Sequence, residues 1–143
     1  LVGFGDARRD YWLGLSNIKS LTKQRDVKTM LRIEVTDANG TTTFVEYYDF
    51  DLKFKDFSLH LGRINYESTA GDGFRDSVGT GFVAPDTNAE APSSNCAKNS
   101  RSGWWMPTAA AKCSGRSNLN GLFPDGIKWN GLSGFIRTEM KIK

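Results

Sequence analysis

The two cysteines are the residues of this chain best suited to covalent chemistry. Cys96 and Cys113 lie on either side of the pair Trp104-Trp105, among Asn, Ser and Gly residues typical of loops. Such a pair framing a loop in a small chain favours a disulfide, which is typical of extracellular proteins. Closing a loop of about 15 residues would stabilise the fold by roughly 3 kcal/mol. The alternative is a pair of buried free thiols, as found inside cells.

Catalytic chemistry has little support in the sequence. His60 is the one histidine, and no motif places a nucleophile beside it. If the cysteines are paired, neither a thiolate nucleophile nor a zinc site can be assembled from them. We therefore expect the protein not to be an enzyme.

Composition narrows the possible partners. The chain has 143 residues, with 19 Lys and Arg scattered among 16 Asp and Glu, and therefore no continuous basic stripe that would favour a nucleic-acid partner. No apolar run is long enough to insert into a membrane. The start at Leu1-Val2-Gly3 has neither Met nor a leader pattern, and we expect a segment cut from a longer mature protein. The length suits a single domain, 1–143.

The first part of the chain carries the regular elements. Apolar residues alternate with polar ones over 31–36, turn residues occupy 37–40, and a second strand-like run spans 41–48, which together predict a β-hairpin. The alternating run 54–61 is expected to extend the same antiparallel sheet. Upstream, Ser16 could cap a short helix that runs through Leu21.

Regular periodicity almost disappears after Ala70, and turn-forming residues dominate. The predicted fold class is α+β. A small antiparallel sheet with short helices (1–69) is followed by a loop-rich, disulfide-stapled ligand-binding subdomain (70–143). We expect that second part to be stabilised by the disulfide, a bound ion and four aromatic residues: Trp104, Trp105, Phe123 and Trp129.

Short motifs follow one another along the second half in a fixed order. They are Asn95-Cys96-Ala97, Gly103-Trp104-Trp105-Met106, Lys112-Cys113, Asn118-Leu119-Asn120-Gly121, Asp125-Gly126-Ile127-Lys128-Trp129 and Thr138-Glu139-Met140-Lys141-Ile142. Tyr11-Trp12-Leu13-Gly14-Leu15 and Ala70-Gly71-Asp72 precede them. Over nearly the whole chain, this series resembles the fibrinogen-related domains of fibrinogen chains, ficolins, tachylectins, angiopoietins and tenascins. The family's opening subdomain is missing, and segments that usually rim its ligand pocket differ in length.

A calcium site is indicated by one acidic segment. The spacing Asp86-x-Asn88-x-Glu90 puts side-chain oxygens on alternate residues, as a hard cation requires. The resemblance implies Asn88 and Glu90 as side-chain ligands, with the carbonyls of Pro92 and Ser94. One carboxylate among the two matched positions implies reduced affinity. The alternative is a solvated acidic loop without an ion.

The resemblance also implies a pocket for an acetyl group beside the second cysteine. In the family, the peptide bond before that cysteine, here Lys112–Cys113, is often cis and orients backbone N–H groups toward the ligand. One Trp of the pair is expected in the core while its neighbour lines the pocket. The expected contacts are Trp105, Met106, Lys112, Cys113, Ser114, Phe123 and Asp125. Ser114 stands where the family commonly has His.

The function implied is a secreted recognition module with lectin-like binding of acetylated glycans or glycoproteins, in innate immune pattern recognition. Two alternatives stay open: an extracellular matrix or signalling module that binds a protein receptor, and a structural remnant without a ligand. Oligomerisation would come from regions outside this chain. A glycosylation motif, Asn39-Gly40-Thr41, lies in the predicted hairpin turn.

Overall fold

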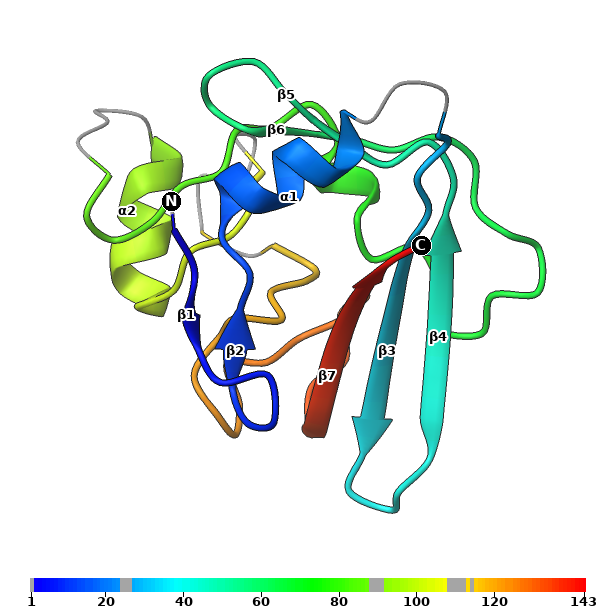
Figure 1. Ribbon diagram of the computed structural model, residues 1–143. Helices are drawn as coiled ribbons and strands as arrows, with labels where there is room; N and C mark the ends of the chain where they lie inside the picture. The colour runs from blue at the N-terminus through cyan, green and yellow to red at the C-terminus, as the bar shows by residue number, and fades with distance from the viewer. Residues whose placement is uncertain (1, 24–26, 88–91, 108–112, 114) are drawn as a thin grey trace.

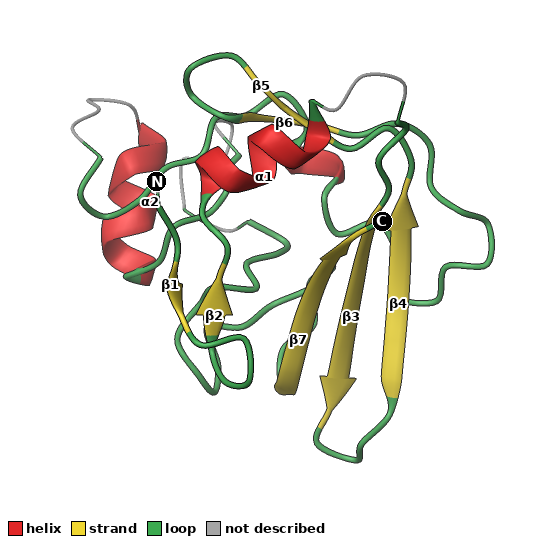
Figure 2. Cartoon of the chain, viewed as in Figure 1, coloured by secondary structure: helices red, strands yellow, loops and turns green. Residues whose placement is uncertain are grey.

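In the computed structural model, the described residues form three small antiparallel sheets and two short α-helices (Figures 1 and 2). The structure describes residues 2–23, 27–87, 92–107, 113 and 115–143. In chain order the elements are β1 (Phe4–Gly5), β2 (Tyr11–Trp12), α1 (Leu15–Thr22), β3 (Leu31–Asp37), β4 (Thr42–Tyr47), β5 (Asp51–Lys53), β6 (Ser58–His60), a 3-10 turn (Arg75–Ser77), α2 (Pro92–Ser100) and β7 (Phe135–Ile142). The predicted α+β class is confirmed.

The main sheet has the strand order β4-β3-β7. The predicted hairpin is confirmed, because β3 and β4 pair in register through Ile33 and Val45, around the turn at 38–41. Alternate residues of β3 point into the core: Leu31, Ile33 and Val35 are at most 1% exposed. Burying one face of the pair fixes its register, since a slip of one residue would expose these side chains.

The third strand of that sheet comes from the far end of the chain. β7 pairs with β3 along its length, with Met140 opposite Ile33. The prediction that regular periodicity ends near Ala70 is therefore wrong at the C-terminus. From Ile136 to Lys143, apolar or Thr residues alternate with charged ones, which is the pattern of a half-buried strand.

The prediction that the run 54–61 extends the main sheet is wrong. Its strand β6 pairs with β5 in a separate two-stranded sheet. The reason is local: Phe54 and Phe57 have φ angles of 57° and 54°, and this left-handed backbone turns the chain back on itself between the two strands. Alternation marked a strand correctly but could not identify its partner.

Both helices differ from expectation in detail. α1 begins at Leu15, with Gly14 rather than Ser16 at the N-cap, and it buries Leu15 and Ile18. α2 was not predicted. It begins at Pro92, and proline is a common residue at the start of helices; the helix buries Cys96 and Ala97. These two apolar residues are too few to produce a visible helical period.

The loop-rich part has an aromatic core in place of a sheet. Phe74 is fully buried at its centre, stacked on Trp104 with the ring centroids 5.3 Å apart and edge-on to Trp129 at 5.1 Å. Tyr47 of β4 also contacts Phe74, at 5.8 Å, so the same cluster joins the loops to the main sheet. Offset and edge-to-face ring pairs add about 0.5–1.5 kcal/mol each beyond the buried area. Phe123, expected among the stabilising rings, is instead 69% exposed.

Candidate functional site

A disulfide between Cys96 and Cys113 tethers the candidate recognition segment, residues 112–114, to α2. The two Cα atoms are 5.0 Å apart, and the bond closes a sequence separation of 17 residues. The predicted pairing is confirmed, and the alternative of two free thiols is ruled out. Cys96 is buried at 3%, whereas Cys113 is exposed. The bond therefore fixes an exposed point of the chain to a buried one.

The tryptophan pair lies entirely within the core. Trp104 and Trp105 are both 0% exposed. The backbone of Trp104 exchanges hydrogen bonds of 2.9 and 3.0 Å with Val83, and the indole N–H of Trp105 donates to the carbonyl of Phe57 at 2.8 Å. The expectation that one indole lines a pocket is therefore wrong for this structure. Met106, at 7% exposure, is also buried.

A network of two asparagines connects residues 118–120 to the backbone just before the tryptophan pair. The amide of Asn118 donates to Ser102 Oγ at 2.8 Å, and its carbonyl oxygen accepts the backbone N–H of Asn120 at 3.0 Å. Asn120 in turn donates to the carbonyl of Gly103 at 2.9 Å. Sequence reasoning missed this role, although Asn-x-Asn is the composition of a side-chain-stabilised turn. The network fixes residues 118–120 against the segment that carries the tryptophan pair.

The turn 121–126 displays two of the expected contacts. Its ends are held by a hydrogen bond of 2.7 Å from the N–H of Gly126 to the carbonyl of Leu122. The backbone is packed so closely that a Cβ on Gly121 would lie 1.8 Å from the carbonyl oxygen of Gly126, so only glycine fits there. Phe123 and Asp125 are both exposed on this turn. Their side chains are therefore accessible to a ligand.

The remaining expected contacts divide into two groups. Cys113 is exposed, like Phe123 and Asp125. Lys112 and Ser114, together with the Lys112–Cys113 peptide bond, lie outside the described residues. The acetyl-binding role of these positions stays a prediction.

The expected calcium ligands are only partly described. Asn88 and Glu90 lie outside the described residues, whereas Pro92 and Ser94 form part of the first turn of α2. Carbonyls in a helix accept the N–H four residues later, so an ion would have to use their second lone pair. Among the residues that the structure describes, no three His, Cys, Asp or Glu gather as a metal site. The segment before α2 is anchored at one end by the Val83–Trp104 pair and at the other by Cys96.

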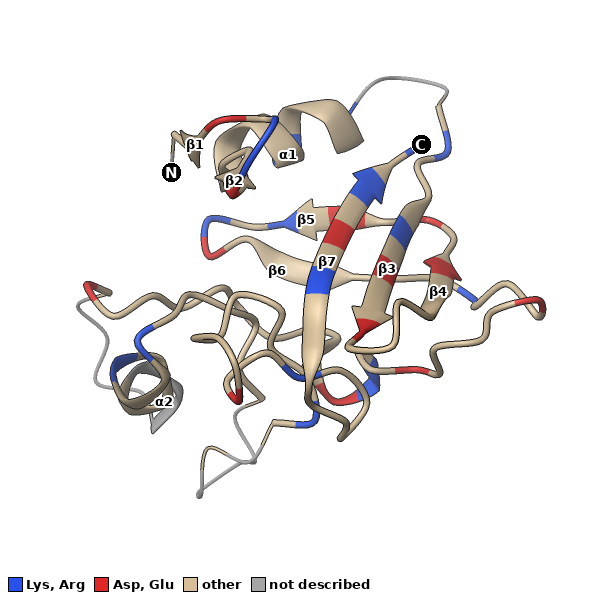
Figure 3. Cartoon of the chain, turned by 90° about the horizontal axis from the view of Figure 1, so that it is seen from below, with Lys and Arg blue, Asp and Glu red and all other residues tan. Residues whose placement is uncertain are grey.

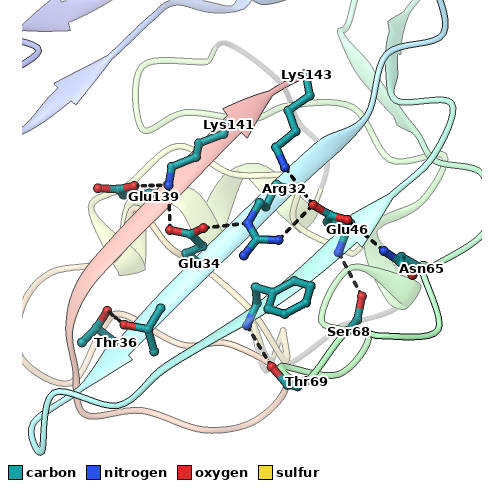
Figure 4. Close-up of polar contacts among 12 residues, drawn as sticks. Arg32, Glu34, Thr36, Glu46, Asn65, Ser68, Thr69, Glu139, Lys141 and Lys143 are labelled. Carbon is teal, nitrogen blue, oxygen red and sulfur yellow. Dashed lines mark hydrogen bonds and ion pairs between the residues drawn. The ribbon is translucent and has the colours of Figure 1, made fainter.

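Charged side chains gather on the outer face of the main sheet (Figures 3 and 4). Glu46 accepts hydrogen bonds from Arg32, Asn65 and Lys143 at 2.9, 2.9 and 3.0 Å, and these donors lower the pKa of its carboxyl to about 2, with Asn65 the largest cause. Lys141 bonds to Glu34 at 2.7 Å.

A shallow hollow of ≈ 180 Å³ opens on this face. It is lined by Glu34, Thr36, Thr42, Arg137, Glu139 and Lys141. Its four charged residues all bond to one another or to Arg32 within the sheet. We interpret the face as structural, because its charges are already paired.

None of the described helices is long and apolar enough to cross a membrane.

Comparison with known proteins identifies the family to which this fold belongs. The family model for the C-terminal globular domain of fibrinogen beta and gamma chains matches residues 1–143. Techylectin-5A of Tachypleus tridentatus is 33% identical to the chain, over 99% of this chain and 50% of its own length. The chain spans between 26% and 50% of the length of the curated relatives that it matches at this level of similarity.

Solved structures agree with the sequence match. The fibrinogen-like globe domain of human ANGPTL2 superposes with a TM-score of 0.83 at 31% identity, over 99% of this chain and 69% of that one. A lamprey fibrin D-dimer in complex with the peptide Gly-His-Arg-Pro-amide superposes at 0.81 with 25% identity, over 99% and 53%. The chain therefore belongs to the family of fibrinogen C-terminal globular domains, a family of non-enzymatic recognition modules.

Proposed function

We propose that the chain is the recognition part of a secreted, lectin-like protein that binds acetylated carbohydrates in innate immune pattern recognition. The observation that carries the proposal is the disulfide from buried Cys96 to exposed Cys113, which fixes an exposed residue of the expected site to helix α2. Techylectin-5A, a lectin by name, matches almost the whole chain and supports the same proposal. A preformed surface binds with a smaller entropic cost than a loop that must be ordered by its ligand.

The chemistry proposed for the site follows from the accessible groups. An acetylamino group needs an apolar contact for its methyl and N–H donors for its carbonyl. Phe123 offers an exposed aromatic ring, and Asp125 offers a carboxylate that can accept hydrogen bonds from sugar hydroxyls. Backbone N–H groups of the segment 112–114 would supply the donors.

Calcium is part of the proposal as a structural ion. Asn88 and Glu90, with the carbonyls of Pro92 and Ser94, would hold it next to the N-terminus of α2. When bound, the ion would supply positive charge that orders the segment between Val83 and Cys96, whose ends are already fixed. With one carboxylate among the two matched side chains, we expect weak binding.

A glycan array tests the proposed function, with the chain linked into oligomers so that weak single-site binding becomes measurable. We expect binding to N-acetylated sugars, competition by the free sugars, and weakening by a calcium chelator. Phe123→Ala and Asp125→Asn should abolish binding, whereas Phe4→Ala, which removes an equally exposed ring from β1, should not. Binding that ignores acetylation would refute the lectin proposal. Indifference to the chelator would remove the proposed role of the ion.

A protein-binding module is the second candidate. Two observations favour it: the close superposition on ANGPTL2, and the bound peptide of the lamprey fibrin structure. Asp125 could meet a peptide amine, but Ser100 stands at the position where the family resemblance implies a second acidic residue. Ser100 carries no charge and accepts a hydrogen bond from the hydroxyl of Ser102 at 3.0 Å. A protein receptor captured by the oligomer, with no effect of acetylated sugars, would select this candidate.

A further inference from the structure

We propose that Asn39 carries an N-linked glycan. Of the nine asparagines in the chain, Asn39 is the one followed by the acceptor pattern x-Thr or x-Ser, here Gly40-Thr41. The inference rests on the secretion included in the proposed function, but not on sugar binding. A sequence match of this kind is frequent by chance, so the geometry of the site decides its weight.

The structure places the motif at the tip of the β3–β4 hairpin. Residues 38–42 are all exposed, and the turn projects beyond the body of the molecule (Figure 1). Gly40 has a φ angle of +82°, and no heavy atom beyond its two chain neighbours lies within 4 Å of the position a Cβ would take. The space around the turn is therefore open to an oligosaccharide.

Asp37 organises the turn without using the acceptor side chain. Its carboxylate accepts the backbone N–H groups of Asn39 and Thr41, each at 2.9 Å, while its own N–H donates to the carbonyl of Thr41 at 3.0 Å. In the described part of the chain, the side-chain amide of Asn39 makes no hydrogen bond. The amide can therefore carry a substituent without loss of an interaction that stabilises the fold.

The reaction needs a lipid-diphosphate-linked oligosaccharide as co-reactant, supplied by the secretory pathway. The side-chain nitrogen of Asn39 forms a bond to C1 of the first sugar, and the bond from C1 to the diphosphate oxygen breaks. The lipid diphosphate leaves with that electron pair, and the nitrogen loses one proton. No oxidation or reduction occurs.

The proposed glycan lies far from helix α2, to which Cys113 is tethered. The hairpin tip and α2, to which Cys113 is tethered, lie at opposite sides of the molecule in Figure 1 and are also well separated in Figure 3. We therefore expect the glycan to leave ligand binding unchanged.

The test is expression of the full chain in eukaryotic cells behind a heterologous secretion leader, which makes the result independent of the protein's own targeting. Intact mass spectrometry should show the chain mass of 15.9 kDa increased by an oligosaccharide. Peptide N-glycosidase should remove that increase and leave Asp at position 39. Asn39→Gln and Thr41→Ala should each abolish the increase, and the matched variant Thr41→Ser should retain it.

Two outcomes would overturn the proposal. One is wild-type protein recovered from the medium or the secretory compartments without a glycan, and the other is a glycan that persists in Asn39→Gln. Neither outcome depends on the glycan array, so failure of this inference is distinguishable from failure of sugar binding. The glycosylated protein and Asn39→Gln should share one unfolding midpoint, because the acceptor amide makes no hydrogen bond to the described residues.

Discussion

The main sheet and the loop-rich part of this molecule are stabilised by different means. β3 has a paired strand on each side and buries alternate side chains on one face. The described residues between 70 and 134 contain one α-helix and otherwise depend on isolated backbone pairs, the ring cluster around Phe74, the asparagine network and one disulfide. A sheet shares its stability among many repeated bonds, whereas the loop-rich part concentrates it in a few residues. The part that carries the candidate site is thus the part most sensitive to single changes.

The largest effect should come from the centre of the ring cluster. Phe74→Ala removes a fully buried ring that contacts Tyr47, Trp104, Trp105 and Trp129, and we expect a loss of about 3–5 kcal/mol in the free energy of unfolding. Urea unfolding followed by tryptophan fluorescence measures it. Phe4→Ala, at a ring that is 73% exposed, is the control and should change stability by less than about 0.5 kcal/mol. A loss near that of the control would show that the cluster is not a core.

Removal of the disulfide should have the next largest effect. Replacing Cys96 and Cys113 together by Ala opens a loop of 17 residues, and we expect a loss of about 3 kcal/mol. Hydrogen exchange resolved by residue should show reduced protection at 117–129 while β3 keeps its protection. Equal loss of protection in β3 would contradict the division of the molecule into two differently stabilised parts.

Glu46 provides a test of the sheet through pH. Its carboxyl has a pKa of about 2 in the folded protein against 4.5 as the ordinary value, so the unfolded chain takes up this proton first as the pH falls. Its contribution is therefore fully present above about pH 4.5 and is lost as the pH falls toward 2. We expect Glu46→Gln to lose about 2 kcal/mol at pH 7 and to approach the wild type near pH 2.

Urea unfolding at a series of pH values measures this difference. Glu67→Gln, at an exposed carboxylate, is the matched control and should stay close to the wild type throughout. A deficit of Glu46→Gln that is independent of pH would mean that packing, and not charge, explains the role of the residue.

The smallest effect is expected on the outer edge of the sheet. Arg137 is 71% exposed and pairs with Glu139 on the same strand. Such exposed pairs contribute about 0–1 kcal/mol, so Arg137→Ala should change the free energy of unfolding by less than about 0.5 kcal/mol. A larger loss in the same urea experiment would indicate that the charged face acts as one cooperative network.

The sequence predicted the parts of the fold whose signals are local. The β3–β4 hairpin, α1 and the disulfide all follow from nearby residues: alternation around a turn, helical spacing, and two cysteines framing a loop. The pairing of β6 and of β7 could not be predicted in the same way, because a strand pattern does not name its partner. α2 was missed because Cys96 and Ala97 alone make no apolar period.

The sequence predicted which segments form the candidate site, but not which of its side chains are buried. Motif order located Cys113, Phe123 and Asp125, and these side chains are exposed as a binding surface requires. The sequence could not show that Trp105 lies beneath the surface, because a Trp pair looks the same whether it packs against other rings or faces solvent. Its burial follows from contacts with Phe74 and Phe82, which are distant in sequence.

Titration of the isotopically labelled chain with an N-acetylated sugar, followed by backbone amide chemical shifts, tests the central claim most directly. Recognition by the loop-rich part predicts saturable shifts concentrated at residues 113–126, with the amides of β3 unchanged. The contrary result would be shifts that gather on the charged face of β3, β4 and β7, or no saturable shift at any sugar concentration.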